Sequence, residues 1–153
     1  MQKIAFIDSE IGGAKYNNIQ DLGAILDNGS EFHSPRVSDF ADFVAECPFL
    51  CGHNIVGHDL HFLAPHLHHP FKPIDTLPLS PLLFPRRQYH HLVKDDKLQS
   101  DELNNPLNDA KQARQLFLDE VNAFLALPPT RQSLYGTLLY PFPQFQGFFD
   151  YLS

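Results

Sequence analysis

The chain opens on an apolar strand that ends in two acids. Residues 4–7 read Ile-Ala-Phe-Ile, and Asp8, Ser9 and Glu10 follow directly. Side chains alternate between the two faces of a strand, so Asp8 and Glu10 should project side by side on one face. Two carboxylates this close raise each other's pKa unless a cation lies between them. The spacing therefore indicates either a divalent metal site with oxygen ligands or a strand end that leads into a polar loop.

Composition is that of one globular domain. The 153 residues are 43% hydrophobic and 19% charged, which is ordinary for a folded chain. No apolar stretch approaches the roughly 18 residues that a membrane span needs, and the N-terminus lacks a signal-peptide pattern. We therefore expect a cytoplasmic protein without a membrane partner. Cys47 and Cys51 suit that reducing compartment as small buried apolar residues.

The net charge of −7 argues against a general binder of the nucleic-acid backbone, because such affinity comes from clustered Lys and Arg. The basic residues are nevertheless unevenly placed, since four of them fall within one twelve-residue stretch: Arg86, Arg87, Lys94 and Lys97. This stretch is either a contact for a polyanion or a solvated basic loop.

Strand and helix patterns alternate along the chain. Apolar runs bounded by turn residues predict strands over 3–10, 19–26, 31–33 and 49–52, with Asn28-Gly29 as a hairpin turn. Helical periodicity predicts helices over 37–46, 55–63 and 108–127, and residues 74–76 read as a strand that ends in a helix cap. The last helix carries a core-facing stripe made of Ala110, Ala113, Leu116, Phe117, Val121, Phe124 and Leu125.

The C-terminal stretch differs from the rest. Residues 130–153 are rich in Phe, Tyr, Gln and Pro and almost free of charge. We divide the chain into a domain over 1–128 and a segment over 129–153. That segment is either an aromatic extension that packs back on the domain or the start of a linker to a missing domain, in which case the chain is a piece of a longer protein.

Two further acids follow later in the chain. Asp59 stands in the run His53-Asn54-Ile-Val-Gly-His-Asp, directly after a predicted buried strand, and Asp109 lies in the first turn of the long helix. Each acid by itself also fits an ordinary acid at a helix start, which the helix dipole favours.

The order of these motifs resembles the DEDD, or DnaQ-like, superfamily of 3′–5′ exonucleases, which includes the epsilon proofreading subunit of DNA polymerase III and ribonuclease T. Supporting matches are Asp21-Leu-Gly-Ala-Ile on the second strand and Pro73-Ile-Asp-Thr-Leu after the second motif. The resemblance covers about residues 3–127. It implies an α/β, ribonuclease-H-like fold in which helices flank a mixed central sheet.

The resemblance also implies a site. Asp8, Glu10, Asp59 and Asp109 would bind two divalent cations, Mg²⁺ or Mn²⁺, and a nucleoside monophosphate would be released from a DNA or RNA 3′ end. The implied substrate contacts are Ile11, Gly12 and Gly13 under the terminal nucleotide, Asn54 near the scissile bond, and Arg86 and Arg87 in the basic stretch.

Implied partners are a second copy of the chain and a fused or associated helicase or polymerase. The segment His90–Lys94 and the aromatic C-terminal end resemble exonuclease-like domains fused to RecQ-type helicases.

The chain departs from the family at the general base. Family members carry a His five residues before the last Asp, where this chain has Asn104, or a Tyr four residues before it, where this chain has Asn105. An asparagine side chain does not take up a proton near neutral pH. Three accounts follow: His90 or His91 serves as the base, metal-bound water reacts without a protein base, or the domain has lost catalysis and only binds. Ile11 also replaces a customary Thr.

Overall fold

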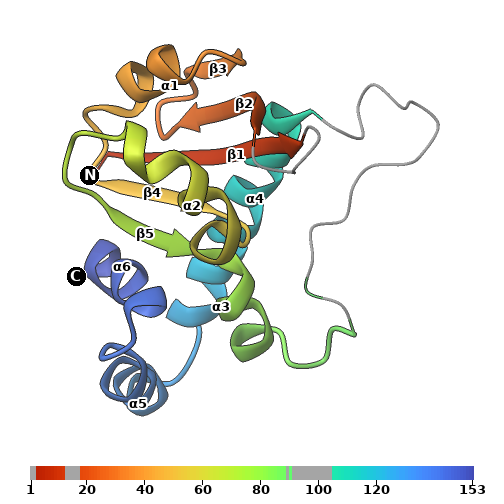
Figure 1. Ribbon diagram of the computed structural model, residues 1–153. Coiled ribbons are helices and arrows are strands. Elements are labelled where there is room, and N and C mark those ends of the chain that lie inside the picture. Colours follow the sequence, from red (N-terminus) through yellow and green to blue (C-terminus); the bar gives the residue numbers. More distant parts are fainter. Residues whose placement is uncertain (1–2, 13–17, 89, 91–104) are drawn as a thin grey trace.

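A five-stranded mixed sheet forms the centre of the computed structural model, which describes residues 3–12, 18–88, 90 and 105–153 (Figure 1). The strand order is β3-β2-β1-β4-β5. The strands are β1 (Ile4–Gly12), β2 (Asn18–Leu26), β3 (Glu31–Ser34), β4 (Phe49–Gly52) and β5 (Lys72–Asp75). β1 pairs antiparallel with β2 and parallel with β4, while β3 and β5 extend the sheet on either side. This is the predicted α/β architecture.

Helices connect the strands and cover the sheet. They are α1 (Val37–Val44), the π-helical turn η1 (Ile55–Asp59), α2 (Leu60–Leu63), the 3₁₀ turn η2 (Ala64–His66), α3 (Thr76–Leu83), α4 (Pro106–Leu125), α5 (Pro129–Leu139) and α6 (Pro143–Leu152). The helix predicted over 55–63 is divided into η1 and α2, and the helix predicted over 37–46 ends at Val44. None of the helices in the described ranges is both long and apolar enough to cross a membrane.

Alternation along β1 separates the core into two layers. Ile4 and Phe6 lie in the cluster that includes residues of α4 and α6. Ala5 and Ile7 point to the opposite face and lie in a second cluster with residues of α1, η1 and α2. Because both faces of this central strand are covered, it reads as a continuous apolar run, as expected for a buried strand with a parallel neighbour. Asp8 and Glu10 continue the α4-facing row beyond this core.

The long helix α4 begins two residues earlier than predicted, with Pro106 in its first turn. Most of its predicted core stripe is buried, but the prediction for Leu125 is wrong, because that side chain is 55% exposed. Each helical residue turns by about 100°, so Leu125 lies one step past the buried Phe124, in the last turn, and points away from the sheet. Glu120, which the pattern left outside the stripe, is fully buried instead.

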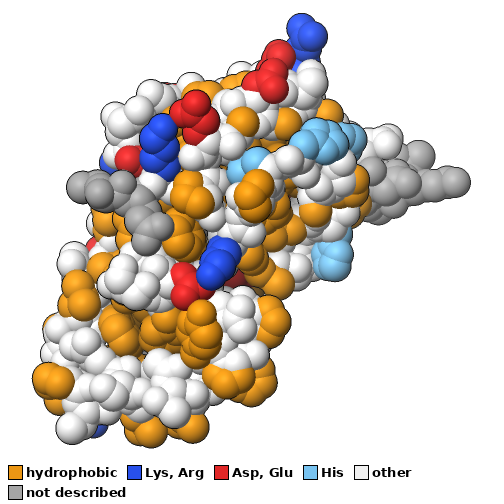
Figure 2. Space-filling view, turned by 90° about the vertical axis from the view of Figure 1, so that its left-hand side faces the viewer, with side chains coloured by type: hydrophobic (Ala, Val, Ile, Leu, Met, Phe, Trp, Pro, Cys, Tyr) orange, Lys and Arg blue, Asp and Glu red, His pale blue; other side chains and the backbone are white. Residues whose placement is uncertain are grey.

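The aromatic segment after residue 128 packs back on the domain. Helix α6 lies beside β5, and Gly147 permits the approach, because a Cβ there would be 2.2 Å from the carbonyl oxygen of Pro73. Phe148 is buried and contacts Phe117 and Phe124 of α4 edge-on. Figure 2 views the side of the molecule that lies to the left in Figure 1. Hydrophobic side chains cover much of its lower half, at the height of α5 and α6. That a linker to a further domain starts here stays a prediction.

Phe148→Ala should lower the free energy of unfolding by about 3–5 kcal/mol, because it leaves a cavity between α6 and α4. Denaturation in urea, followed by circular dichroism, measures the change. Phe142→Ala is the matched control, since Phe142 is 51% exposed, and it should cost less than about 1 kcal/mol. Equal effects of the two variants would contradict the packing of α6 as part of the domain core.

Candidate metal centre

Asp8 and Glu10 lie toward the carboxyl end of β1. β4 pairs with β1 only as far as Phe6, so both acids extend beyond the end of β4. A register shift in the β1–β2 ladder directly follows Glu10. The carboxyl ends of parallel strands are where open α/β sheets bind ligands, and irregular pairing often re-aims side chains beside such sites. The two acids thus stand where the sequence pattern predicted them.

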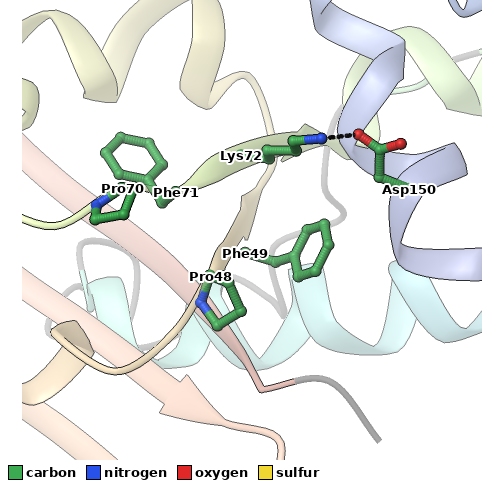
Figure 3. A pocket seen from close by; sticks show the side chains of 6 residues that line it. All are labelled: Pro48, Phe49, Pro70, Phe71, Lys72 and Asp150. Atoms are coloured by element: carbon green, nitrogen blue, oxygen red, sulfur yellow. Dashed lines mark hydrogen bonds and ion pairs between the residues drawn. The ribbon is translucent and has the colours of Figure 1, made fainter.

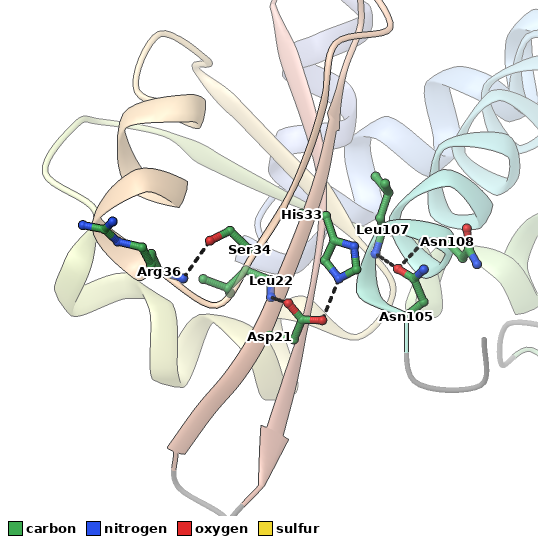
Figure 4. A network of polar contacts seen from close by, with 8 residues as sticks. All are labelled: Asp21, Leu22, His33, Ser34, Arg36, Asn105, Leu107 and Asn108. Carbon is green, nitrogen blue, oxygen red and sulfur yellow. Dashed lines mark hydrogen bonds and ion pairs between the residues drawn. The ribbon is translucent and has the colours of Figure 1, made fainter. Parts of the chain in front are cut away.

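Helix α4 brings the third acid. The side-chain oxygen of Asn105 accepts hydrogen bonds from the backbone N–H groups of Leu107 and Asn108, at 3.0 and 3.4 Å, and so caps the helix (Figure 4). Asp109 follows in the first turn and is 6% exposed. One carboxylate oxygen from each of Asp8, Glu10 and Asp109 lies within 4.8 Å of the other two. Residues a hundred positions apart thus form one acidic cluster.

Asp59, the fourth predicted acid, is buried at the end of η1 and is hydrogen-bonded to β1. Its Oδ2 accepts hydrogen bonds from the backbone N–H of Ser9, at 2.9 Å, and from the Ser9 hydroxyl, at 2.6 Å. Ser9 stands between Asp8 and Glu10, so these bonds tie the fourth acid to the strand that carries the first two. Nδ1 of His58 lies 3.4 Å from Oδ1 of Asp59.

Without a bound cation, the negative charges of the clustered acids repel one another, and protonation is the way to reduce this repulsion. Burial, followed by the nearby charges of Asp59 and Asp109, raises the pKa of Asp8 to about 10. Burial also raises the pKa of Asp59, although the hydrogen bonds from Ser9 act in the opposite direction. A divalent cation would relieve this repulsion, and carboxylate oxygens are the ligands that Mg²⁺ and Mn²⁺ prefer. The donor set therefore fits such ions.

Asp75, which the sequence places both in a predicted helix cap and in the Pro73–Leu77 supporting match, makes further contacts in the structure. Its carboxylate accepts hydrogen bonds from three backbone N–H groups, those of Asn54 at 2.8 Å, Val56 at 3.0 Å and Leu77 at 3.0 Å. Asn54 directly precedes η1, and Val56 is the second residue of η1. Asn54 adopts a left-handed conformation there, with φ of 65°. Asp75 thus holds the segment that carries Asp59.

The predicted substrate contacts are only partly brought together. Ile11 and Gly12 continue β1 beyond the acids, and Asn54 lies at the start of η1, whereas Gly13 lies outside the described residues. Arg86 and Arg87 follow α3 and help line a cavity of about 390 Å³ with Leu83, Phe84 and Pro85. The guanidinium carbon of Arg87 lies 4.4 Å from the centre of the Phe84 ring.

Four residues stand at the positions considered for a general base, and the structure describes two of them, Asn105 and His90. Asn105 uses its side chain to cap α4. Nδ1 of His90 lies 2.8 Å from the hydroxyl of Ser80 on α3. Asn104 and His91 lie outside the described residues.

A larger cavity of about 520 Å³ lies away from the acids (Figure 3). Its lining includes Phe49 and Lys72, the first residues of β4 and β5, so it sits at the amino ends of these strands. Pro48, Pro70 and Phe71 make it mostly apolar, and Lys72 forms an ion pair with Asp150 at its edge. Because the acids lie at the carboxyl ends, this cavity is separate from the metal centre.

Two solved structures share the fold, although no family model and no curated protein sequence matches the chain. NrnC of Brucella melitensis, bound to pGG, gives a TM-score of 0.57 at 15% identity, over 98% of this chain and 85% of NrnC. The family B DNA polymerase of the hyperthermophilic archaeon Pyrobaculum calidifontis gives 0.52 at 14% identity, over 82% of this chain and 25% of the polymerase. At these identities the likeness concerns the fold alone. The fold is ribonuclease-H-like and exonuclease-like, as the order of the motifs predicted.

The stability of the metal-free protein should fall as the pH rises. The folded state keeps a proton on Asp8 that the unfolded state releases near pH 4, so the free energy of unfolding decreases between about pH 4 and 10, by up to about 1.4 kcal/mol per pH unit. Denaturation in chelator between pH 6 and 9 measures the slope. Asp8→Asn should reduce the slope and leave the part due to buried Glu120, whose pKa is raised to about 9. The exposed control Asp42→Asn should leave the whole slope. A wild-type curve without this slope would contradict the strained cluster.

Asp75→Asn should weaken Mn²⁺ binding about 10- to 100-fold, because the amide NH₂ cannot accept hydrogen bonds and the turn before Asp59 loosens. Isothermal titration calorimetry measures the affinity. Asp27→Asn is the matched control, since Asp27 also accepts a backbone hydrogen bond, from Ile4 at 3.3 Å, but lies at the opposite end of β1. Unchanged affinity in Asp75→Asn would show that Asp75 does not position the fourth acid.

Proposed function

We propose that this chain is a metal-dependent 3′–5′ exonuclease domain of the DEDD superfamily. It would hydrolyse phosphodiester bonds at the 3′ ends of DNA or RNA and release nucleoside monophosphates. The observation that carries the proposal is the meeting of Asp8, Glu10 and Asp109 within 4.8 Å, at the carboxyl end of a central strand. Three buried or half-buried acids this close do not stabilise the fold by themselves, because each negative charge disfavours the ionisation of the others.

Asp8, Glu10, Asp59 and Asp109 would hold two divalent cations, Mg²⁺ or Mn²⁺. Two such ions stabilise both the attacking and the leaving oxygen of an in-line displacement at phosphorus. After burial, the charges of Asp59, Asp109 and Glu10 all raise the pKa of Asp8, so Asp8 is the acid that would be shared between the ions. Asp59 keeps its orientation through Ser9, so its other oxygen would be the ligand.

The charge distribution favours recognition of a strand end over recognition of a long strand. A chain with a net charge of −7 offers little attraction to an extended phosphate backbone, whereas bound cations would attract the terminal phosphodiester locally. Ile11, Gly12 and Gly13 follow the first two acids, and Asn54 lies close to the fourth along the chain, so they are the proposed contacts to the terminal nucleotide. Arg86 and Arg87 are proposed to contact the phosphates further along. The presence of pGG in the NrnC structure supports a short substrate.

A second candidate function is a nucleic-acid-binding or regulatory module on the same fold, with weakened or lost catalysis. The asparagines at positions 104 and 105 favour it, because neither can act as the general base and Asn105 is engaged in the cap of α4. In either case the proposed partners are DNA or RNA 3′ ends, a second copy of the chain, and a helicase or polymerase.

The first test follows the shortening of 5′-labelled single-stranded DNA, single-stranded RNA and pGG, with release of mononucleotides, in the presence of Mn²⁺. Stepwise shortening from the 3′ end is expected, and Asp8→Ala should abolish it. Residual activity in Asp8→Ala would identify a contaminating nuclease. Wild-type protein that binds Mn²⁺ and the oligonucleotide without cleaving it would overturn the exonuclease proposal in favour of the binding module.

Asn104→His separates the accounts of the missing base. If metal-bound water reacts without a protein base, the histidine should raise turnover by about 10²–10⁴-fold. His90→Ala is the companion variant. Loss of activity in His90→Ala, with no gain in Asn104→His, would assign the base to His90.

A further inference from the structure

We propose that Gly23 on β2 is a positioning residue of the metal centre, because the absence of its side chain sets the distance between Asp109 and Asp8. The inference rests on the proposed function, since it concerns the same acids. Gly23 lies outside the acidic cluster and offers no ligand atom. It acts through the contact between its Cα and the first turn of α4.

Gly23 lies directly opposite Asp8. The two residues are partners in the antiparallel ladder of β1 and β2, so their side-chain positions share one face of the sheet. That face is covered by α4, because Ile25 and Phe6, the next residues of the same rows, pack in the cluster with Ala110 and Phe117. A side chain at position 23 would therefore point toward α4, immediately beside the carboxylate of Asp8.

The backbone of α4 occupies the space that such a side chain would need. A Cβ at position 23 would lie 2.2 Å from the amide nitrogen of Leu107, 2.4 Å from the carbonyl carbon of Pro106 and 2.6 Å from Cα of Leu107. All three are backbone atoms, so no rotamer change relieves the overlap. The first turn of the helix rests on the bare Cα of Gly23.

The same turn carries Asp109. Leu107 is two residues before Asp109, whose backbone N–H donates to the carbonyl oxygen of Asn105 at 3.2 Å. The Asn105 side chain caps the turn, and Figure 4 shows Asn105, Leu107 and Asn108 together at this end of α4. Because the turn is closed by these bonds, a displacement at Leu107 carries Asp109 with it. The helix is also held farther along, where Lys111 pairs with Glu31 of β3 at 2.9 Å.

An alanine at position 23 therefore forces the first turn of α4 away from β2. Cβ atoms essentially never approach closer than 3.0 Å, so the separation must grow by about 0.8 Å from the present 2.2 Å. Asp8 belongs to β1 and stays with the sheet, whereas Asp109 moves with the helix. A displacement of about 1 Å at a reacting centre can cost on the order of 10²-fold in rate.

The test compares Gly23→Ala with Gly147→Ala. Gly147 is the matched control, because a Cβ there also meets backbone at 2.2 Å, but at Pro73 in the contact between α6 and β5 and not at the turn of α4 that carries Asp109. Calorimetry with Mn²⁺, circular dichroism and the exonuclease assay are run on wild type and both variants. Gly23→Ala should bind Mn²⁺ about 10- to 100-fold more weakly, while Gly147→Ala keeps the wild-type affinity.

The outcomes separate this inference from the proposed function. The role of Gly23 is overturned if a folded Gly23→Ala protein binds Mn²⁺ with wild-type affinity. It is also overturned if Gly23→Ala and Gly147→Ala weaken Mn²⁺ binding equally. If wild type binds Mn²⁺ but releases no mononucleotide, the exonuclease proposal falls, and the affinities still decide the role of Gly23. If wild type binds no Mn²⁺, the metal centre and this inference fall together.

A second pair of variants keeps the test decisive if Gly23→Ala does not fold. Asn105→Ala removes the cap of the same turn without adding bulk to the interface and should weaken Mn²⁺ binding. Asn105→Ser restores a capping oxygen and should recover the affinity, since serine caps helices about as well as asparagine. Wild-type affinity in Asn105→Ala would contradict the view that this turn sets the position of Asp109.

Discussion

The close approach of Asp8 and Asp109 is the constraint on which the rest of this structure depends. Asp8 belongs to the central strand and Asp109 to the long helix. Burial, followed by the nearby charges of Asp59 and Asp109, raises the pKa of Asp8 to about 10. Such an arrangement persists only if the surrounding packing holds the strand and the helix together. The shared core of Phe6, Ala110 and Phe117 supplies that packing, and the contact of α4 with Gly23 fixes how close the two elements come.

The four acids come from three elements: Asp8 and Glu10 from β1, Asp59 from η1 and Asp109 from α4. Further contacts restrain each of these elements. Ser9 ties Asp59 to β1 through two hydrogen bonds, Asp75 secures the turn before η1 through two more, and Asn105 caps the helix that carries Asp109. Sites of metal-assisted chemistry need this kind of support, because ligand atoms must hold their positions while substrate and product exchange. The positions of the acids therefore depend on hydrogen bonds between side chains and backbone N–H groups as well as on the acids themselves.

Much of the fold followed from local patterns, and the errors have physical causes. Strand periodicity, the Asn28-Gly29 turn and the stripe on α4 predicted the main elements. The apolar stripe of α4 predicts a core position for Leu125, although Leu125 lies one helical step beyond the buried Phe124 and is exposed. Glu120 is not part of the predicted stripe, which consists of apolar residues only. It is fully buried and, in the part of the chain that the structure describes, its carboxylate has no hydrogen-bond partner, so burial raises its pKa to about 9.

The sequence by itself determined the chemistry of this protein: which residues are acids, which of them share a strand face, and in what order the motifs follow. These properties depend on side-chain type and on the period of a strand or helix, and both are local. Only the tertiary structure decided that Asp109 meets Asp8, that Asp75 holds the turn before Asp59, and that α6 completes the core. Those contacts join residues far apart in the chain, and their distances depend on how closely two backbones approach, as at Gly23 and Gly147. A glycine in a sequence does not say which backbone will lie against it.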